Sequence, residues 1–508
     1  MASSTIPANP SPHNVSALLP KLYDADSDLR FMGLNDLRHI LNIAQSQFIV
    51  HDYSLCCKVI DGLLHTINDP NGDVQNMAIQ CLGPFVNKVP ETILSPLIDR
   101  ISTMQTENVV DQSIPALALR TVVVSLPRPI PGIPRTKNIA EAYSAISKVL
   151  VTRLIGHHVF PPSGSVTPTP KGMLRVDIEN AADSNAIDVL IEIAKCFGPM
   201  LQTAEVDALQ KITMEILDDT RTGSVMKKKA ITALSALSTS FSDGMLSNFV
   251  SRLIEGLRDP HLTNGRRKLY ITILGSLART VPSKFGPYLT TLSPFVLSPL
   301  GQQELDDQFE AAAEDEEKDP EMEEVREAAL VALEGFLASC SLDMRPYTGE
   351  VIDAATRYIK YDPNVADDDD MEDEDEDDAL EGDDFEEEQG FDDDDDVSWK
   401  LRRCAAKLLH TLIQTRSPGD LLEDGTLYKQ VAPALVARFR EREESVRLEV
   451  LSALAVLVQN TRTDKPASSK STGAVSLPSR KRRRAGSCLL YTSPSPRDRT
   501  RSRMPSSA

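Results

Sequence analysis

Apolar residues recur along most of the chain in steps of three and four positions, the spacing of amphipathic helices. Two clear runs are Val74, Ala78, Cys81, Leu82, Phe85, Val89 and Val446, Val450, Leu454, Leu457, Val458. Each run places its apolar side chains on one face of a helix. Aromatic residues make up only 5% of the chain, which favours helix packing over sandwiches or barrels. The pattern predicts an all-α fold.

Several of these helices open with the same short phrase: an acidic or turn-forming residue, then an aliphatic residue and, in most copies, an arginine. The clearest copies are Asp28-Leu29-Arg30, Asp73-Val74-Gln75, Glu324-Val325-Arg326 and Ser445-Val446-Arg447. The Asp or Ser can cap the new helix, and Asp69-Pro70-Asn71-Gly72 predicts a tight turn before it. Each unit is therefore expected to be a helix, a turn and a second helix.

The phrase returns at the period of HEAT repeats. Leu29 and Val74 are 45 residues apart and Val397 and Val446 are 49 apart, against about 40–47 residues for HEAT units. Val325 and Val397 are 72 apart, but 35 of these residues form an acidic stretch, which leaves 37. One helical pair buries too little surface to fold alone, so neighbours must stack. We predict a HEAT-repeat (armadillo-like) superhelical solenoid over residues 15–361 and 397–463.

The acidic stretch, residues 362–396, is predicted to be an insertion in this array. It holds 23 Asp and Glu and no Lys or Arg, so the formal net charge of −21 leaves +2 for the rest of the chain. Its carboxylates lack the ligand spacing of a calcium site, and their mutual repulsion favours a disordered, solvated loop. In the functional alternative, the loop, including Asp392, Asp393, Asp394, Asp395 and Asp396, competes for or steers basic surfaces of partners.

The two ends of the chain are expected to be disordered. Residues 1–14 are rich in Ser and Pro and have no signal-peptide pattern,. Residues 464–508 form a polar, basic tail whose end, Cys488–Ala508, resembles translated read-through sequence more than an evolved segment. Arg480–Arg484 matches a nuclear localisation signal on charge alone, and non-specific affinity for polyanions is the alternative.

No arrangement of residues predicts catalysis, a metal site, a cofactor or a membrane span. The G-x-S-x-G, H-E-x-x-H, P-loop and G-x-G-x-x-G motifs are all missing,. His157-His158 lies in a Pro/Ser/Gly-rich segment with no third ligand nearby, which favours a solvated loop. The seven cysteines are scattered, as in a reduced intracellular protein,. Phe285–Gln303, the longest uncharged stretch, is broken by prolines,. We therefore expect a protein that is not an enzyme.

Four segments resemble the N-terminal region of the CAND family, the cullin-associated, neddylation-dissociated proteins. They are Asp28–Leu37, Gly72–Val86, Tyr361–Asn364 with the acidic run and Val397–Arg403, and Arg438–Val446. The resemblance covers residues 15–463, about the first third of a full-length member. It implies a non-enzymatic HEAT-repeat scaffold whose N-terminal repeats embrace the C-terminal region of an unneddylated cullin and its RING partner. In the family, distant C-terminal repeats occlude the site of the substrate adaptor.

The resemblance implies a role in assembly of cullin–RING ubiquitin ligases and in adaptor exchange, in the cytoplasm and nucleus. It implies no membrane or specific nucleic-acid partner, and a separate chain is one source of the missing C-terminal repeats. Candidate partner-binding residues are Arg30, Gln75, Asn76, Trp399, Lys400, Arg402, Arg403 and Arg447. We expect Lys400, Arg402 and Arg403 to lie along one ridge, and Trp399 to pack on the adjoining helix or contact a partner directly.

A nuclear transport receptor of the importin-β kind is the alternative function. Those receptors are also HEAT arrays, and some carry an acidic loop followed by a Trp and basic residues. The segments that begin at Leu29 and Val74 favour the CAND family over that alternative.

Overall fold

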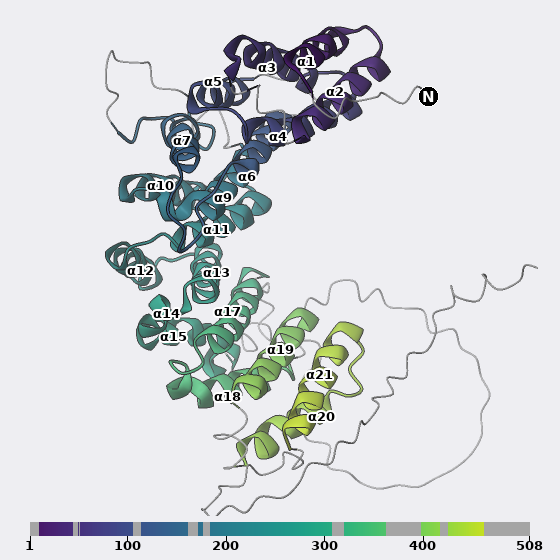
Figure 1. Cartoon of the computed structure of the whole chain (residues 1–508). Coiled ribbons are helices and arrows are strands. Elements are labelled where there is room, and N and C mark those ends of the chain that lie inside the picture. Colours follow the sequence, from purple (N-terminus) through teal and green to yellow (C-terminus); the bar gives the residue numbers. More distant parts are fainter. Residues whose placement is uncertain are drawn as a thin grey trace, which may run out of the picture. The chain divides into compact units, whose positions relative to one another are not determined.

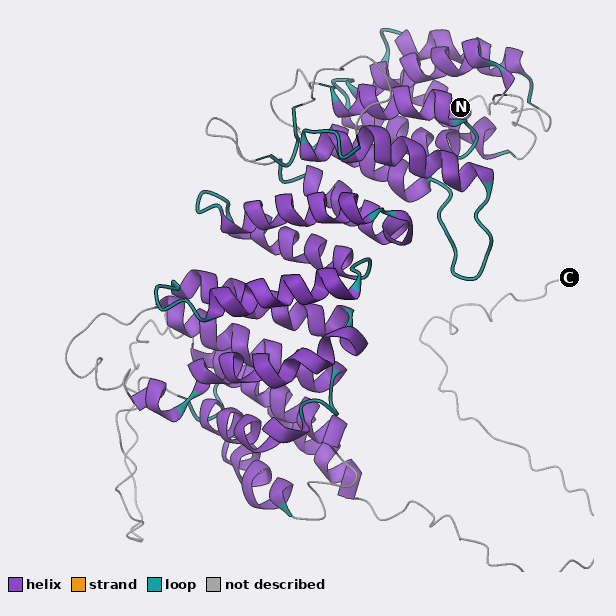
Figure 2. Ribbon diagram, turned by 90° about the vertical axis from the view of Figure 1, so that its left-hand side faces the viewer, coloured by secondary structure: helices purple, strands orange, loops and turns teal. Residues whose placement is uncertain are grey.

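The computed structural model describes residues 10–43, 49, 51–104, 113–160, 171–175, 183–306, 320–361, 398–416 and 425–461. Helices and loops make up all of this described part, and no strand occurs in it (Figure 2). The acidic stretch, residues 1–9 and the basic tail lie outside the described residues, so the predictions for them stay predictions. The all-α prediction is confirmed.

One layer of the array consists of the second helix of each pair, which we call the B helices. Each B helix contacts the next along the chain (Figure 1). They are α2 (Ser27–Asn42), α4 (Gly72–Val86), α6 (Ile114–Ser125), α9 (Ala186–Phe197), α11 (Ser224–Ser238), α13 (Asn264–Thr280), α17 (Pro320–Ser339), α19 (Ser398–Arg416) and α21 (Glu444–Thr461).

The first helices of the pairs, the A helices, cover one side of the B layer. Several are built from two or three short pieces. They are α1 (Pro12–Leu18) with η1 (Leu19–Tyr23), α3 (Tyr53–Ile67), α5 (Glu91–Ser102), α7 (Lys137–Ala145) with η3 (Ile146–Val151) and α8 (Thr152–Ile155), α10 (Thr203–Asp218), α12 (Asp243–Leu257), α14 (Pro282–Phe285) with η5 (Gly286–Tyr288), α15 (Leu289–Leu297) and η6 (Ser298–Leu300), η7 (Arg345–Tyr347) with α18 (Thr348–Tyr358), and η8 (Leu427–Val431) with α20 (Ala432–Ala437). A 3-10 turn, η4 (Gly198–Met200), follows α9. Helical pairs stacked in chain order form a HEAT-repeat solenoid.

The B helices begin slightly earlier than the repeated phrase suggested. The side chain of Asp26 caps α2 by accepting from the Asp28 N–H, and Asn71 caps α4 by accepting from the Asp73 N–H. Asp28 and Asp73 instead lie in the first turn, where a carboxylate favours the positive end of the helix dipole. In the described residues the first helix, α1, starts at Pro12, so residues 12–14 belong to a helix and not to a disordered end.

The apolar core runs through the whole described array. The phrase residues Val74, Val325 and Val446 are almost fully buried, as predicted. Leu29 is an exception: 39% of its surface is exposed, and α2 is the first B helix that the structure describes. Val458, at the other end of the described array, is 52% exposed, whereas Val446, Val450 and Leu457 of the same apolar run are buried.

Candidate functional site: an interaction surface on the B helices

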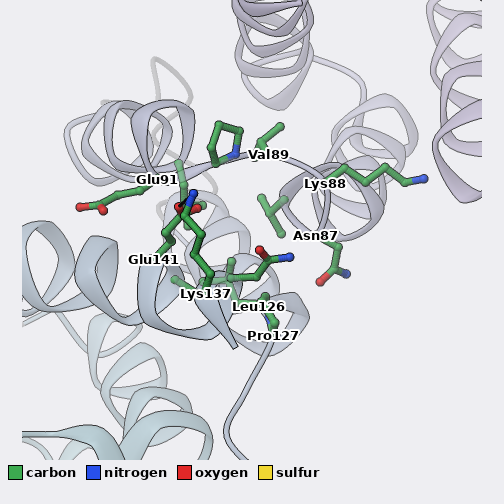
Figure 3. A pocket seen from close by; sticks show the side chains of 13 residues that line it. Asn87, Lys88, Val89, Glu91, Leu126, Pro127, Lys137 and Glu141 are labelled. Carbon is green, nitrogen blue, oxygen red and sulfur yellow. Dashed lines mark ion pairs between the residues drawn. The ribbon is translucent and has the colours of Figure 1, made fainter. Parts of the chain in front are cut away.

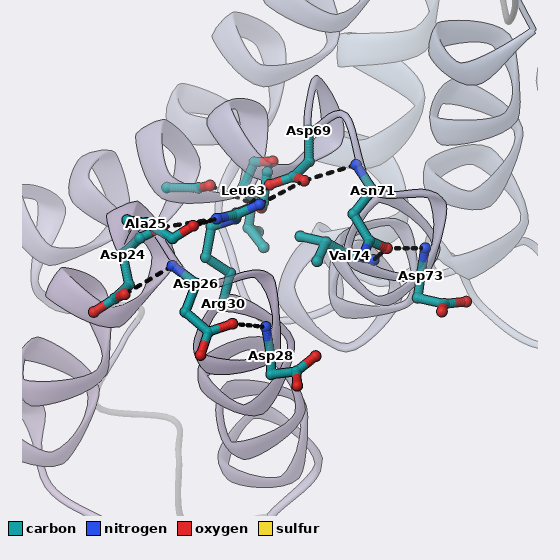
Figure 4. A network of polar contacts seen from close by, with 12 residues as sticks. Asp24, Ala25, Asp26, Asp28, Arg30, Leu63, Asp69, Asn71, Asp73 and Val74 are labelled. Carbon is teal, nitrogen blue, oxygen red and sulfur yellow. Dashed lines mark hydrogen bonds and ion pairs between the residues drawn. The ribbon is translucent and has the colours of Figure 1, made fainter.

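The arginine of the repeated phrase lies near the start of a B helix, and its side chain turns back onto the part of the chain that precedes the helix. Arg30 donates to the carbonyls of Asp24 and Ala25 at 2.8 and 3.0 Å (Figure 4). Arg326 donates to the Glu304 carbonyl at 3.1 Å, and Arg447 to that of Glu441 at 3.1 Å. These carbonyls belong to residues that precede the B helix in sequence, and a carbonyl that is shielded from water needs a donor. The arginine satisfies them and holds the turn.

Arg30 also joins its own repeat to the next one. Its Nε and Nη2 lie 2.6 and 2.9 Å from the two carboxylate oxygens of Asp69, in the turn before α4. Such a two-pronged pair fixes both distance and orientation. Asp69 in turn accepts from the Asn71 N–H at 2.9 Å, so one carboxylate links α2, the turn and the cap of α4.

The environment of Asp69 favours its charged form. Burial opposes ionisation, but the hydrogen bonds from Arg30 and from the Asn71 N–H outweigh it, so the pKa of Asp69 is lowered. The same hydrogen bond raises the pKa of Arg30. Both groups therefore stay ionised at neutral pH, and their pairing is built into the fold.

Arg402 repeats this arrangement at the other end of the described array. Its guanidinium lies 3.2 Å from the Glu441 carboxylate, in the turn before α21. It also donates to the Tyr361 carbonyl at 3.2 Å and to the Ser398 hydroxyl at 2.6 Å. Tyr361 and Ser398 flank the acidic stretch in sequence. One guanidinium thus holds the two described residues on either side of that stretch together.

The two arginine–carboxylate pairs, Arg30 with Asp69 and Arg402 with Glu441, each join residues 39 positions apart. Arg402 is only 4% exposed. The expectation that it shares an exposed ridge with Lys400 and Arg403 is therefore wrong, because its charge is taken up inside the array. Arg30 is also buried, and Arg447 is half-buried. Arg30, Arg402 and Arg447 are predicted to bind a partner, but their described contacts are internal.

An exposed basic stripe lies on another edge of α19. It consists of Lys400, Arg403 and Lys407, whose three- and four-residue spacing aligns them along the helix,. Trp399 is partly buried against the core, and the Lys400 and Arg403 cations each lie 5.9 Å from the centre of its ring. The indole packs on the array and borders the stripe. Lys407 was not among the residues predicted from the sequence, although its helical spacing from Arg403 indicates that it belongs to the same stripe.

Among the described residues, each inner B helix has one side that neither A helices nor neighbouring B helices cover. A helices cover one side and neighbouring B helices cover two, so their exposed residues share the remaining side, which we call the B face. On it, Asn76 is exposed, whereas Gln75 is half-buried. The B face also carries apolar residues: Leu117 and Val124 on α6 are 41% and 38% exposed, and Val331 on α17 is 40% exposed. Asp392–Asp396 lie outside the described residues.

Two of the hollows in the described part of the array lie at its turns, and neither brings reactive groups together. The first, of about 290 Å³, is lined by residues of α4, α5 and α7 such as Glu91, Lys137 and Glu141 (Figure 3). Burial opposes ionisation of Glu91, but hydrogen bonds from Ser144 and Lys148 lower its pKa.

The second hollow measures about 700 Å³ and lies beside the starts of α11 and α13. Its charged groups pair with one another, as in Arg266 with Asp218 and Lys268 with Glu324.

Neither a metal site nor a membrane span can be built from the described residues. They hold no group of three His, Cys, Asp or Glu side chains placed to bind a metal ion. In the same ranges, no helix has the length and apolar character needed to cross a membrane. What the geometry offers is an extended surface of apolar, polar and basic side chains, suited to another protein.

Comparison with known proteins identifies relatives of this chain. Residues 93–308 match the family model described as the N-terminal part of cullin-associated NEDD8-dissociated protein 1. The chain is 44% identical over 293 residues to the N-terminal part of that protein from Emericella nidulans, covering 58% of this chain and 86% of the relative. It is 30% identical over 451 residues to cullin-associated NEDD8-dissociated protein 1 of Drosophila melanogaster, covering 89% of this chain.

The chain spans about a third of the length of the Drosophila relative, 32% of which is covered. Among solved structures, the karyopherin Kap121p bound to the SUMO protease Ulp1p is similar, with a TM-score of 0.53 and 11% identity over 89% of this chain and 38% of that one. This likeness concerns the fold, a helical-repeat array, and extends no further.

Proposed function

The chain belongs to the family of cullin-associated NEDD8-dissociated proteins, and from this premise we propose that it is a non-enzymatic scaffold that binds cullin–RING ubiquitin ligases. The observation that carries the proposal is the 44% identity that extends over 86% of the Emericella nidulans N-terminal part. The name of that relative describes association with cullins and dissociation from NEDD8. The ligand we propose is the C-terminal region of an unneddylated cullin with its RING partner.

The B face is the surface we propose for this contact. It extends over successive repeats, so each repeat adds its own share of the interface. Its apolar residues, such as Leu117 and Val331, can be desolvated on binding, while the basic stripe Lys400, Arg403 and Lys407 supplies charge complementarity to an acidic partner surface,. In this proposal the scaffold acts in the cytoplasm and nucleus, where it regulates ligase assembly and the exchange of substrate adaptors.

An exposed apolar stripe on α21 supports the proposal that further repeats pack against this end of the described array. On α21, Leu448, Leu451 and Val458 are 57%, 46% and 52% exposed, at a spacing that forms one apolar stripe. Each inner B helix packs against another B helix on both sides, whereas α21 packs against α19 alone among the described B helices. We propose that a further helical pair covers this stripe. A separate chain is one source, since the fungal relative is itself named as an N-terminal part.

An importin-β-like transport function is the alternative, but no observation favours it. The similarity to karyopherin Kap121p lies at 11% identity and supports the fold alone. A transport receptor of this kind would be expected to capture Ran-GTP, which makes the two functions separable in one assay.

The test is a pull-down of the full chain with a purified cullin–RING complex, unmodified and neddylated, each with and without bound adaptor. We expect capture of the unmodified complex and weaker capture of the neddylated one. An attached ubiquitin-like protein would clash with the surface of this chain that binds the cullin. Adaptor release should not occur with this chain alone, since a second contact at the far end of the cullin is needed to compete. Linking two contacts raises avidity by roughly 10²- to 10⁴-fold.

Equal capture of both forms, or adaptor release by this chain alone, would refute the mechanism. Capture of Ran-GTP in place of the cullin would support the transport receptor instead.

A further inference from the structure

The loop between α6 and α7 is an exposed proline-rich segment that plays no part in the proposed cullin contact. It reads Leu126-Pro-Arg-Pro-Ile-Pro-Gly-Ile-Pro-Arg-Thr136. The ends of the loop lie close together, since Leu126, Pro127 and Lys137 line the same hollow (Figure 3). Leu126 is buried at the base, whereas every residue from Ile130 to Thr136 is exposed. The array therefore holds the base of the loop at Leu126 and leaves its tip, Ile130–Thr136, exposed to solvent.

A tight turn shapes the tip in the free chain. The Ile133 N–H donates to the Ile130 carbonyl at 3.1 Å, and Gly132 has a φ of 81°. Pro131 followed by Gly132 with positive φ is the signature of a type II turn. The two isoleucines at its corners are 56% and 57% exposed. Two neighbouring aliphatic side chains without intramolecular cover, on a loop stiffened by four prolines, suit recognition by another protein.

The order of residues fits one mode of recognition. In a polyproline II helix, which has three residues per turn, Arg128, Pro131 and Pro134 fall on one edge and Ile130 and Ile133 on the next. Ile130-Pro131 and Ile133-Pro134 are then two equivalent aliphatic-proline pairs, with a cation one turn before the first. SH3 domains bind such PxxP segments in aromatic-lined grooves.

We propose that this loop docks into an SH3-type domain whose groove ends in an acidic pocket for Arg128. Charge supports this occupant: Arg128, Arg135 and Lys137 are exposed, and no acidic residue occurs from Leu126 until Glu141. A groove rimmed by carboxylates complements this loop, whereas a basic surface would repel it.

Binding requires Gly132 to leave the turn and become extended. Glycine adopts both conformations readily, and its position is open, with nothing within 4 Å of where a Cβ would be. The one hydrogen bond of the turn is lost, but it joins two exposed residues, so water replaces it. From Arg128 to Pro134 a polyproline II segment spans about 19 Å. The segments Leu126–Arg128 and Pro134–Lys137 reach up to about 7 and 10 Å. Leu126 and Lys137 lie apart from each other on the wall of one hollow, so the loop can close without unwinding α7.

The experiment titrates the full chain against a panel of purified SH3 domains. The wild type should bind at least one domain, and the double substitution Pro131→Ala with Pro134→Ala should weaken that binding by roughly tenfold or more, because both groove contacts are removed. Arg128→Glu should also weaken binding of the SH3 domain, and the loss should be larger at low salt than at high salt. Gly132→Ala should bind at least as well as the wild type, because Ala disfavours the turn and favours the extended form.

Leu342→Ala is the matched control, since Leu342 is an exposed aliphatic residue (70%) on a different loop; it should bind like the wild type. Thermal unfolding should be the same for all of these variants, because the loop tip is not part of the core. The proposal is overturned if no SH3 domain binds the wild type, if binding survives the double substitution, or if Gly132→Ala abolishes it.

Discussion

Two edges of helix α19 place neighbouring arginines in opposite environments. Arg402 is buried between repeats, where it contacts the Glu441 carboxylate and the Tyr361 carbonyl. Arg403 is exposed and borders the Trp399 ring. The difference teaches that neighbouring basic residues on one helix of a repeat protein can have different roles, because each lies on a different face of the helix. One arginine satisfies polar groups of the turns and holds the repeats together, whereas its neighbour remains available to a partner.

Removing Arg402 is expected to give the largest effect on folding. Arg402→Ala removes the nearer cation from the buried Glu441 carboxylate, which keeps Arg438 at 3.5 Å, and removes a donor from the Tyr361 carbonyl. Breaking a buried pair from one side costs about 3–5 kcal/mol. Arg403→Ala, the matched control on the same turn, should change stability by no more than about 0.5 kcal/mol. Urea unfolding and hydrogen exchange of α19 and α21 measure both. Equal effects of the two substitutions would contradict the division.

The Asp69 pair at the other end is expected to give a smaller, pH-dependent effect. Asp69→Asn weakens a hydrogen-bonded ion pair by about 1.5–3 kcal/mol at neutral pH. The folded-state pKa of Asp69 is lowered, so the stability that its ionisation contributes is present above the unfolded value of about 3.9. It is lost as the pH falls through the lower folded pKa. Unfolding measured from pH 7 to pH 3 should show the gap between wild type and variant closing below about pH 4; a gap that is constant with pH would argue against the pair.

Charge reversal of the exposed stripe is expected to have the smallest effect on folding and a clear effect on binding. The triple substitution Lys400→Glu, Arg403→Glu and Lys407→Glu should change stability by no more than about 1.5 kcal/mol, since each exposed site contributes about 0.5 kcal/mol or less. Capture of the unneddylated cullin–RING complex should fall, most strongly at low salt, because screening weakens exposed charges.

A matched triple on A helices, Lys58→Glu, Lys211→Glu and Arg252→Glu, controls for net charge. These residues are exposed on α3, α10 and α12, away from the B face. If both triples reduce capture equally, the effect belongs to total charge and the stripe has no special role.

Much of the array was predictable from sequence because helical spacing is a local property. Even the burial of Arg402 had a sequence signal: with Ala406, Leu409 and Ile413 it forms a second apolar stripe beside that of Leu401, and all of these residues are buried. A helix that packs against B helices on both sides needs two such stripes. A prediction based on the Leu401 stripe alone places Arg402 on the surface.

The carboxylate partners were not predictable in the same way. Asp69 and Glu441 each lie 39 residues from their arginines, and only the stacking of one repeat on the next brings them together. The exposure of Leu29 has a related reason: its apolar character alone does not reveal that α2 is the first B helix in the described array. Sequence patterns report one helix at a time, whereas these features depend on the neighbour.

The contacts of Arg402 also bear on how this protein can change over evolution. Because one guanidinium joins Tyr361 to Ser398, the 36 residues between them enter and leave the array at a single point. Once the ends of a chain segment are fixed, doubling its length adds only about 0.6 kcal/mol of closure entropy. Insertions and deletions at this point are therefore nearly neutral for the fold, and natural selection can set the length and acidity of the segment by other criteria.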